Sequence, residues 1–124
     1  MTTLTTGALF AMLALLALGH LYFLYLEMFA WTKPSTVKTF GVTPEFAEQS
    51  RVLAANQGLY NGFLAAGLIW ALLAPQDLRK PVALFFSACV LAAGLYGGAT
   101  ASKRIFIVQA LPGALTLLLA IAAQ

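Results

Sequence analysis

Four long apolar stretches separated by short polar ones constrain this chain more than any other feature of its sequence. Hydrophobic residues fill 61% of the 124 positions and charged residues only 9%, whereas soluble domains average about 25% charged residues. Too few charges remain to cover a surface exposed to water. The pattern therefore predicts an integral membrane protein rather than a soluble globule.

Each apolar stretch is long enough to cross a bilayer, because ~30 Å at 1.5 Å per residue needs about 20 residues. Thr43, Pro44 and Glu45 suit a helix start, as cap, first helical residue and first-turn acid. Pro112 is a candidate for a kink in the last helix. We expect helices over residues 7–31, 44–74, 81–101 and 104–123, with a polar connection over 32–42 and a tight polar turn over 75–80.

Short connections make neighbouring helices run antiparallel. The expected fold is an all-α, integral membrane four-helix bundle of up-down-up-down topology, forming a single domain over residues 1–124. No internal repeat is evident, which disfavours an inverted-repeat transporter within one chain.

The basic residues predict the orientation in a bacterial inner (cytoplasmic) membrane. Cytoplasmic loops carry the excess of Lys and Arg. Five basic residues belong to the first and third connections and two to the opposite side, so both termini are expected to be extracytoplasmic. The five are Lys33, Lys38, Arg51, Lys103 and Arg104, and the two are Arg79 and Lys80.

Other function classes have little support. The net charge of +3 is divided among the loops, which disfavours nucleic-acid binding. The single cysteine, Cys89, lies in an apolar run, where a packing thiol is the default. No His or Cys lies at ligand spacing from another, so we expect neither a metal site nor a cofactor.

The polar side chains of the apolar segments gather in their cytoplasmic halves. This asymmetry predicts a ligand-binding site between the helices, in which amides, hydroxyls and one acid satisfy a polar ligand. The alternative is that the amides only hold helices together, at perhaps ~0.6 kcal/mol each. The candidate residues are His20, Glu27, Asn56, Gln57, Tyr60, Asn61, Tyr96 and Gln109, with Arg104 as a possible charge partner of Glu27.

The second helix is expected to have three faces. Its polar residues should point inward, its small residues should let helices approach closely, and its bulky residues should face lipid. The small set is Ala54, Gly58, Gly62 and Ala66, and the bulky set is Val52, Leu59 and Phe63.

Glu27 is the strongest single candidate, because an ionisable carboxyl inside a membrane costs at least ~2.5 kcal/mol on insertion scales. Lipid supplies no donors, so we expect Glu27 to turn inward and bond to the amides or tyrosine of the second helix, or else to Arg104. His20 lies about 10 Å from it along the helix, too far for direct pairing. A lone histidine is more often a packed residue than a ligand.

Four sequence blocks carry a family resemblance: HLYFLYLEMFAW at 20–31, TPEFAEQSRVLAANQGLYNGFLAAGLIW at 43–70, LYGG at 95–98 and QALPG at 109–113. Over nearly the whole chain they resemble a bacterial family catalogued as domain of unknown function 1304. That resemblance implies a small integral membrane protein and assigns no activity.

RVLAANQGLYNGF at 51–63 is more loosely similar to the second helix of the MAPEG family, membrane glutathione-using and eicosanoid enzymes with four-helix subunits. Arg51 and Ala55 match that pattern. Ala54 stands in place of an Arg, Asn56 of a His and Asn61 of a Glu, so the charged part of the pattern is missing.

Three functions stay open, and the sequence names no catalytic residue. The favoured one is a protein, not an enzyme, that binds or passes a small ligand. The others are a MAPEG-like membrane enzyme and a structural or interaction subunit of a membrane complex. Membrane lipids are expected partners, and four helices enclose little volume, so a homo-oligomer is expected too.

Overall fold

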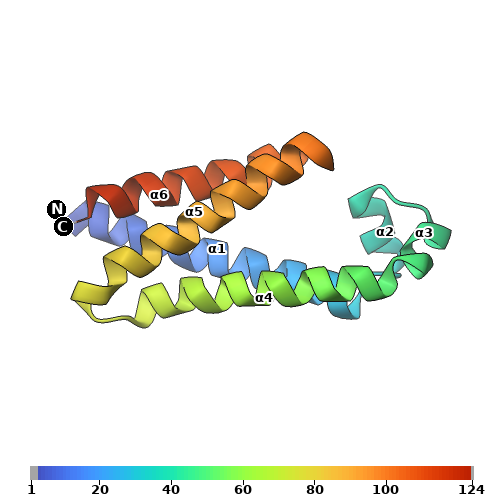
Figure 1. Ribbon diagram of the computed structural model, residues 1–124, viewed down its shortest axis with the longest axis horizontal. Helices are drawn as coiled ribbons and strands as arrows, with labels where there is room; N and C mark the ends of the chain where they lie inside the picture. Colours follow the sequence, from blue (N-terminus) through green and yellow to red (C-terminus); the bar gives the residue numbers. More distant parts are fainter. Residues whose placement is uncertain (1–2, 124) are drawn as a thin grey trace. The chain divides into compact units, whose positions relative to one another are not determined.

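The computed structural model describes residues 3–123, and all the regular structure in them is helical (Figure 1). The all-α fold class is therefore confirmed. The elements are α1 (Thr3–Phe29), α2 (Pro34–Phe40), α3 (Pro44–Gln49), α4 (Arg51–Leu73), α5 (Gln76–Thr100), the π-helical turn η1 (Phe106–Ala110) and α6 (Leu111–Ala122).

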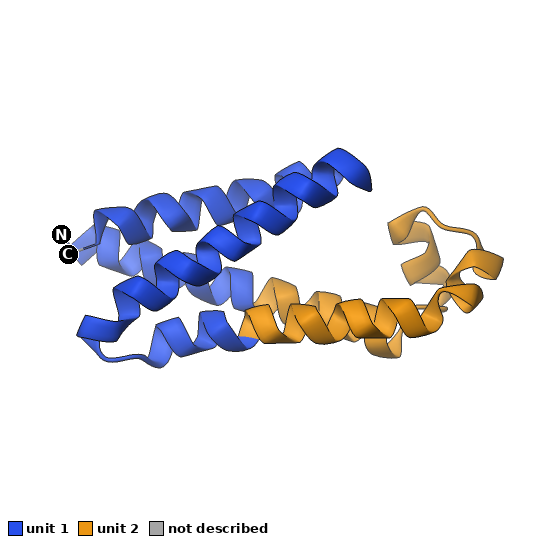
Figure 2. Ribbon diagram, viewed as in Figure 1, with its two compact units in different colours: residues 1–17, 66–124 blue, residues 18–65 orange. Residues whose placement is uncertain are grey.

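The chain divides into two compact units (Figure 2). Unit 1 comprises residues 1–17 and 66–124, and unit 2 comprises residues 18–65. The two longest apolar elements of the first half, α1 and α4, contribute one part to each unit. The single domain over 1–124 stays a prediction.

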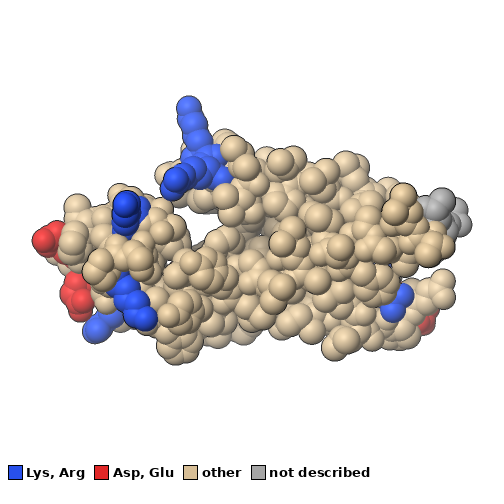
Figure 3. Space-filling model, turned by 180° about the vertical axis from the view of Figure 1, so that it is seen from behind, with Lys and Arg blue, Asp and Glu red and all other residues tan. Residues whose placement is uncertain are grey.

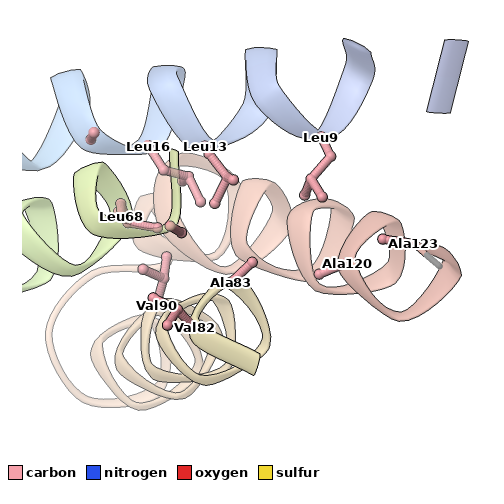
Figure 4. Close-up of a cluster of buried hydrophobic side chains, with 11 residues drawn as sticks. Leu9, Leu13, Leu16, Leu68, Val82, Ala83, Val90, Ala120 and Ala123 are labelled. Carbon is pink, nitrogen blue, oxygen red and sulfur yellow. The ribbon is translucent and has the colours of Figure 1, made fainter. Parts of the chain in front are cut away.

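Unit 1 has a core of aliphatic side chains (Figure 4). Leu9, Leu13 and Leu16 lie one helical turn apart along α1 and are almost fully buried. Leu68 from α4 and Val90 from α5 are fully buried in the same cluster. Burial of such side chains contributes about 1.5–3 kcal/mol each, so this cluster is the main source of cohesion in unit 1.

Glycines let α5 pack closely against η1 and α6. A Cβ on Gly94 would collide with the backbone of Ala110. A Cβ on Gly113 would lie 2.9 Å from the backbone nitrogen of Leu91. Both positions therefore require the absence of a side chain, as in small-residue packing between membrane helices.

The third expected helix needs correction at its start, and the fourth contains a π turn. The third begins at Gln76, not at residue 81, so most of the expected polar turn is its first turn. Pro81 lies inside this helix as its sixth residue, where it has no N–H to donate to the carbonyl of residue 77. The fourth begins at Arg104, as expected, and residues 106–110 form the π turn η1, after which the Leu111 N–H donates to the Phe106 carbonyl. This turn ends two residues before Pro112, whose ring cannot fit a regular helix interior.

The expected polar connection over 32–42 is largely the helix α2. Pro34 opens this helix, because proline is pre-organised for the first helical position. Gly41 ends it with φ +67°. The Gly41 N–H donates to the Lys38 carbonyl and the Val42 N–H to the Val37 carbonyl, each at 3.2 Å, the Schellman pattern of a glycine-terminated helix.

The expected second helix, 44–74, is two helices that meet at Ser50. Its predicted start is confirmed: Thr43 accepts a 3.1 Å hydrogen bond from the Phe46 N–H, and Pro44 is the first helical residue. Ser50 ends α3 with φ −95° and ψ 6°. Its hydroxyl accepts a 3.1 Å bond from the Trp31 indole, so this junction is tied to the segment that follows α1.

Two helices, α1 and α5, are long and apolar enough to cross a membrane, which weakly indicates a membrane protein. The apolar stretch over 106–122 is shorter, and α4 does not meet the same criterion among the described residues. On the face shown in Figure 3, the charged side chains gather in a few places and leave broad helical surfaces without charge. The four-span arrangement is taken up below as a proposal.

Candidate functional site

A carboxyl group and an amide are bonded to each other in unit 2. The Asn61 side-chain nitrogen donates to Glu27 Oε1 at 2.6 Å, and each residue is 8% exposed. Glu27 lies near the end of α1 and Asn61 in the middle of α4. The contact expected between Glu27 and the amides of the second helix is therefore present, and Asn61 supplies it.

Glycines on α4 make this bond possible. A Cβ on Gly58 would lie 2.7 Å from Met28 Cγ, 3.0 Å from Glu27 Cβ and 3.2 Å from the Leu24 carbonyl oxygen. A Cβ on Gly62 would lie 2.6 Å from Leu24 Cδ1. The short Asn61 side chain reaches Glu27 because these neighbours have no side chains of their own. The small-residue contact predicted for Gly58 and Gly62 is confirmed.

His20 is buried on the same helix, two turns before Glu27. It is 2% exposed, and its ring meets the Phe23 ring edge-on, with centroids 5.7 Å apart. The rise of α1 between positions 20 and 27 is about 10 Å. His20 and Glu27 therefore mark two polar points of one buried stripe and do not form a pair.

The expected inward orientation of the polar arc on α4 is wrong for three of its four residues. Asn56 and Gln57 are exposed, and Tyr60 is 58% exposed. Asn56 donates to the carbonyl of Val52 in its own helix at 2.9 Å. The buried face of α4 in this unit is instead the stripe of Ala54, Gly58, Asn61 and Ala65, spaced by four and three residues, and Gly58 and Asn61 in it meet α1.

The remaining candidates belong to unit 1. Tyr96 is 75% exposed on α5. Arg104 is exposed, and its backbone N–H donates to the Ser102 hydroxyl at 3.4 Å. Gln109 is half-buried in the π turn η1. Their part in a common site with Glu27, including Arg104 as its charge partner, stays a prediction.

A shallow groove of about 370 Å³ lies on unit 2, and no pattern in the sequence predicted it. It includes Arg51, whose guanidinium is 3.6 Å from the exposed carboxylate of Glu48, and Asn56, a predicted site residue. The groove is lined by Met28, Arg51, Val52, Ala55, Asn56 and Leu59. Among residues 3–123, no three His, Cys, Asp or Glu residues come together as metal ligands would.

Comparison with known proteins places these features in a family. The family described as "Protein of unknown function (DUF1304)" matches residues 14–121. The chain belongs to the DUF1304 family. The uncharacterised protein YpaA of Lactococcus lactis subsp. lactis (strain IL1403) is 38% identical over 97 residues, which cover 77% of this chain and 81% of the relative. No solved structure matches the chain.

The DUF1304 match begins six residues before His20 and includes Glu27 and Asn61. All the residues in the buried stripe of α4 also lie within it. The bonded carboxyl and amide are thus part of the family region of this chain. The likeness to the MAPEG family stays a resemblance of sequence pattern.

Proposed function

We propose that this DUF1304 protein is a multi-pass inner-membrane protein, not an enzyme, that binds or passes a small polar ligand at the Glu27–Asn61 pair. The observation that carries the proposal is the 2.6 Å bond between two buried polar side chains on predominantly apolar helices. A carboxyl group in such surroundings is costly and is a functional candidate by default.

The chemistry of the pair indicates the class of ligand. A carboxylate offers about four acceptor positions on two oxygens. Among residues 3–123, Asn61 is the one group bonded to the Glu27 side chain. The pair therefore retains acceptor capacity for a ligand that carries N–H or O–H donors or a positive charge, and its apolar surroundings would strengthen such bonds.

Native mass spectrometry of the detergent-purified full chain tests this proposal. We expect a small molecule to be retained by the wild type and lost in Glu27→Gln, which keeps the shape of the side chain and removes its charge. Glu45→Gln is the matched control, because Glu45 is an exposed carboxyl on α3 of the same unit. Loss of the molecule in both variants, or a bare protein mass for the wild type, would count against the site.

The proposed topology has four spans, formed by α1, α4, α5 and the continuous helical stretch 104–122, with both termini extracytoplasmic. It is supported by the apolar character of α1 and α5 and by the five-to-two division of basic residues between the two sides. A reporter that is active only in the periplasm should work when fused after Gln124. Activity of a cytoplasmic reporter at that position would reject this orientation.

A second candidate is an interaction subunit that self-associates through α4. Gln57 and Tyr60 are exposed on a helix proposed to lie in lipid, and Asn56 beside them satisfies only part of its amide within its own helix. A second copy of the chain could cover this arc and supply partners for it. Gln57→Leu should then lower the mass of the complex in native mass spectra, whereas Leu73→Ala, at an exposed apolar position of the same helix, should not.

A further inference from the structure

We propose that a cavity in unit 1 binds a phosphate-bearing anion, with Arg79 and Lys80 as its cationic groups. The cavity has a volume of about 470 Å³, within the usual range of small-ligand sites. It lies apart in the sequence from the Glu27–Asn61 pair, and the proposed ligand class has the opposite charge. The lining residues are Thr6, Leu9, Phe10, Gln76, Arg79, Lys80 and Ala123.

Neither cation is neutralised by an acid within the described part of the chain. The ion pair found there joins Arg51 and Glu48 in unit 2. Asp77 lies in the same helical turn as Arg79 and Lys80, but its carboxylate is not within 4.0 Å of either. Two adjacent, half-buried positive charges thus face a cavity in which residues 3–123 supply no countercharge.

The donors of these side chains are only partly used. Arg79 donates from one terminal nitrogen to the Ala74 carbonyl at 2.8 Å and lies 4.7 Å over the Phe10 ring. Its Nε is buried and has no acceptor among the described residues. Lys80 donates to the Ala123 carbonyl. A guanidinium has five N–H donors and an ammonium three, so both retain donors for an anion.

The position of the cavity supports an anionic ligand. Gln76 is the first residue of the 25-residue helix α5, and helix N-termini favour negative charge. Arg79 also lies over the Phe10 ring, and the planar fork of a guanidinium suits the oxygens of a phosphate. Leu9, Phe10 and Ala123 form an apolar wall beside these groups. A phosphate ester attached to a hydrocarbon would use both parts of the cavity, whereas inorganic phosphate would use the polar part alone.

Lipid retention by the detergent-purified full chain tests the proposal. Micelles are doped with phosphatidylglycerol or with phosphatidylcholine of the same acyl chains, and retained lipid is measured by native mass spectrometry. We expect the wild type to prefer phosphatidylglycerol. The double variant Arg79→Gln/Lys80→Gln should lose about 30-fold of that preference, because each basic group near a membrane surface contributes about fivefold.

Lys103→Gln is the control, because it removes one charge from an exposed position of the same unit outside the cavity. It should leave the preference unchanged. Lys80→Gln alone, which keeps Arg79 and its bond to Ala74, should lose about fivefold. If the double variant does not fold, the proposal is tested on the wild type alone. Its preference for phosphatidylglycerol should fall as salt rises from low to physiological ionic strength.

Inorganic phosphate at matched ionic strength separates two sources of the anion. Displacement of phosphatidylglycerol by phosphate would identify free phosphate as a ligand, and retention of the lipid would identify the headgroup. Equal retention of the two lipids by the wild type at low salt would overturn the proposal. So would equal losses in Lys103→Gln and Lys80→Gln, since the preference would then reflect general surface charge.

Discussion

The two units bury polar groups in different ways. In unit 1, Ser87 and Thr116 are fully buried, and each hydroxyl bonds to a carbonyl four residues earlier in its own helix. In unit 2, Glu27 and Asn61 are buried and bond to each other from two different helices. The hydroxyls of unit 1 keep their hydrogen bonds whatever the position of their helix relative to its neighbours, because the acceptors belong to the same helix. The pair in unit 2 is satisfied only when α1 and α4 are placed correctly.

This difference separates structural polarity from candidate functional polarity. A hydroxyl that bonds back to its own helix is a common way to bury Ser or Thr and specifies no partner. A carboxyl group needs donors that only another element can provide in an apolar region. Unit 1 is therefore held together by apolar packing. Unit 2 contains a hydrogen bond between two side chains that a ligand could replace with hydrogen bonds of its own.

The largest effect should come from overfilling the packing of unit 1 with Gly94→Leu. A side chain at this position would collide with the backbone of Ala110, which cannot move aside as a flexible side chain can. We expect the free energy of unfolding to fall by about 3 kcal/mol or more, at the upper end of overpacking costs. Thermal unfolding in detergent measures it. Gly7→Leu is the control, because no atom lies within 4 Å of a Cβ at Gly7, and equal losses would contradict the packing described for α5.

The next largest effect should come from Asn61→Leu in unit 2. This change leaves the buried Glu27 carboxyl without its partner, and an unsatisfied buried group costs about 1–3 kcal/mol, with charged groups at or above the upper limit. Asn56→Leu removes the same amide from an exposed position of the same helix and should change stability by less than about 0.5 kcal/mol. Thermal unfolding in detergent measures both variants. Similar losses of stability in the two variants would show that the 2.6 Å bond does not contribute to the stability of unit 2.

The double variant Glu27→Leu/Asn61→Leu sharpens the same comparison. Replacing both partners of a buried polar pair by apolar groups can be nearly neutral. We therefore expect the double variant to unfold at a higher temperature than Asn61→Leu alone, although it should lose any bound ligand. If the double variant is the less stable of the two, the pair would be a structural element rather than a site.

The sequence predicted the features that depend on local chemistry. Thr43 and Pro44 start a helix as their side chains dictate, and Gly58 and Gly62 lie against α1 as small residues spaced by four do. The burial of Glu27 and its bond to Asn61 follow from the cost of leaving a carboxyl unpartnered among apolar residues.

The features that depend on the packing of several elements were missed. Four candidates lie on a polar arc of about 140° on α4, at 100° per residue. The sequence could not show which edge of this arc meets α1. In the structure, Asn61 is the member of the arc that bonds to α1. At the helix break, Ser50 accepts a bond from the Trp31 indole, 19 positions away. The cavity at Arg79 and Lys80 joins α1, the start of α5 and the end of α6, which are far apart in the sequence.

An intermediate effect is expected from Gly58→Leu in unit 2. The first obstacle to a side chain there is Met28 Cγ at 2.7 Å, the flexible part of a long side chain that can change rotamer. We expect a loss of about 1–2 kcal/mol, less than for Gly94→Leu. Leu59→Ala, at an exposed neighbouring position, should cost less still. Thermal unfolding in detergent that gave equal losses for the two variants would reject the assignment of faces on α4.

The smallest effect should come from Ser87→Ala in unit 1, although Ser87 is as fully buried as any residue of the core. Its hydroxyl donates to the Ala83 carbonyl, which as a helix carbonyl also accepts the backbone N–H of residue 87. Removing the hydroxyl therefore leaves no buried group without a partner and opens a space of only one oxygen atom. Back-bonding of this kind also slightly weakens a helix, so the lost bond and the relieved helix should nearly cancel, with a net change below about 1 kcal/mol. The measurement is the unfolding temperature beside that of Asn61→Leu in the same detergent. A loss as large as that of Asn61→Leu would mean that the hydroxyls of unit 1 also hold helices together, and the contrast between the two units would disappear.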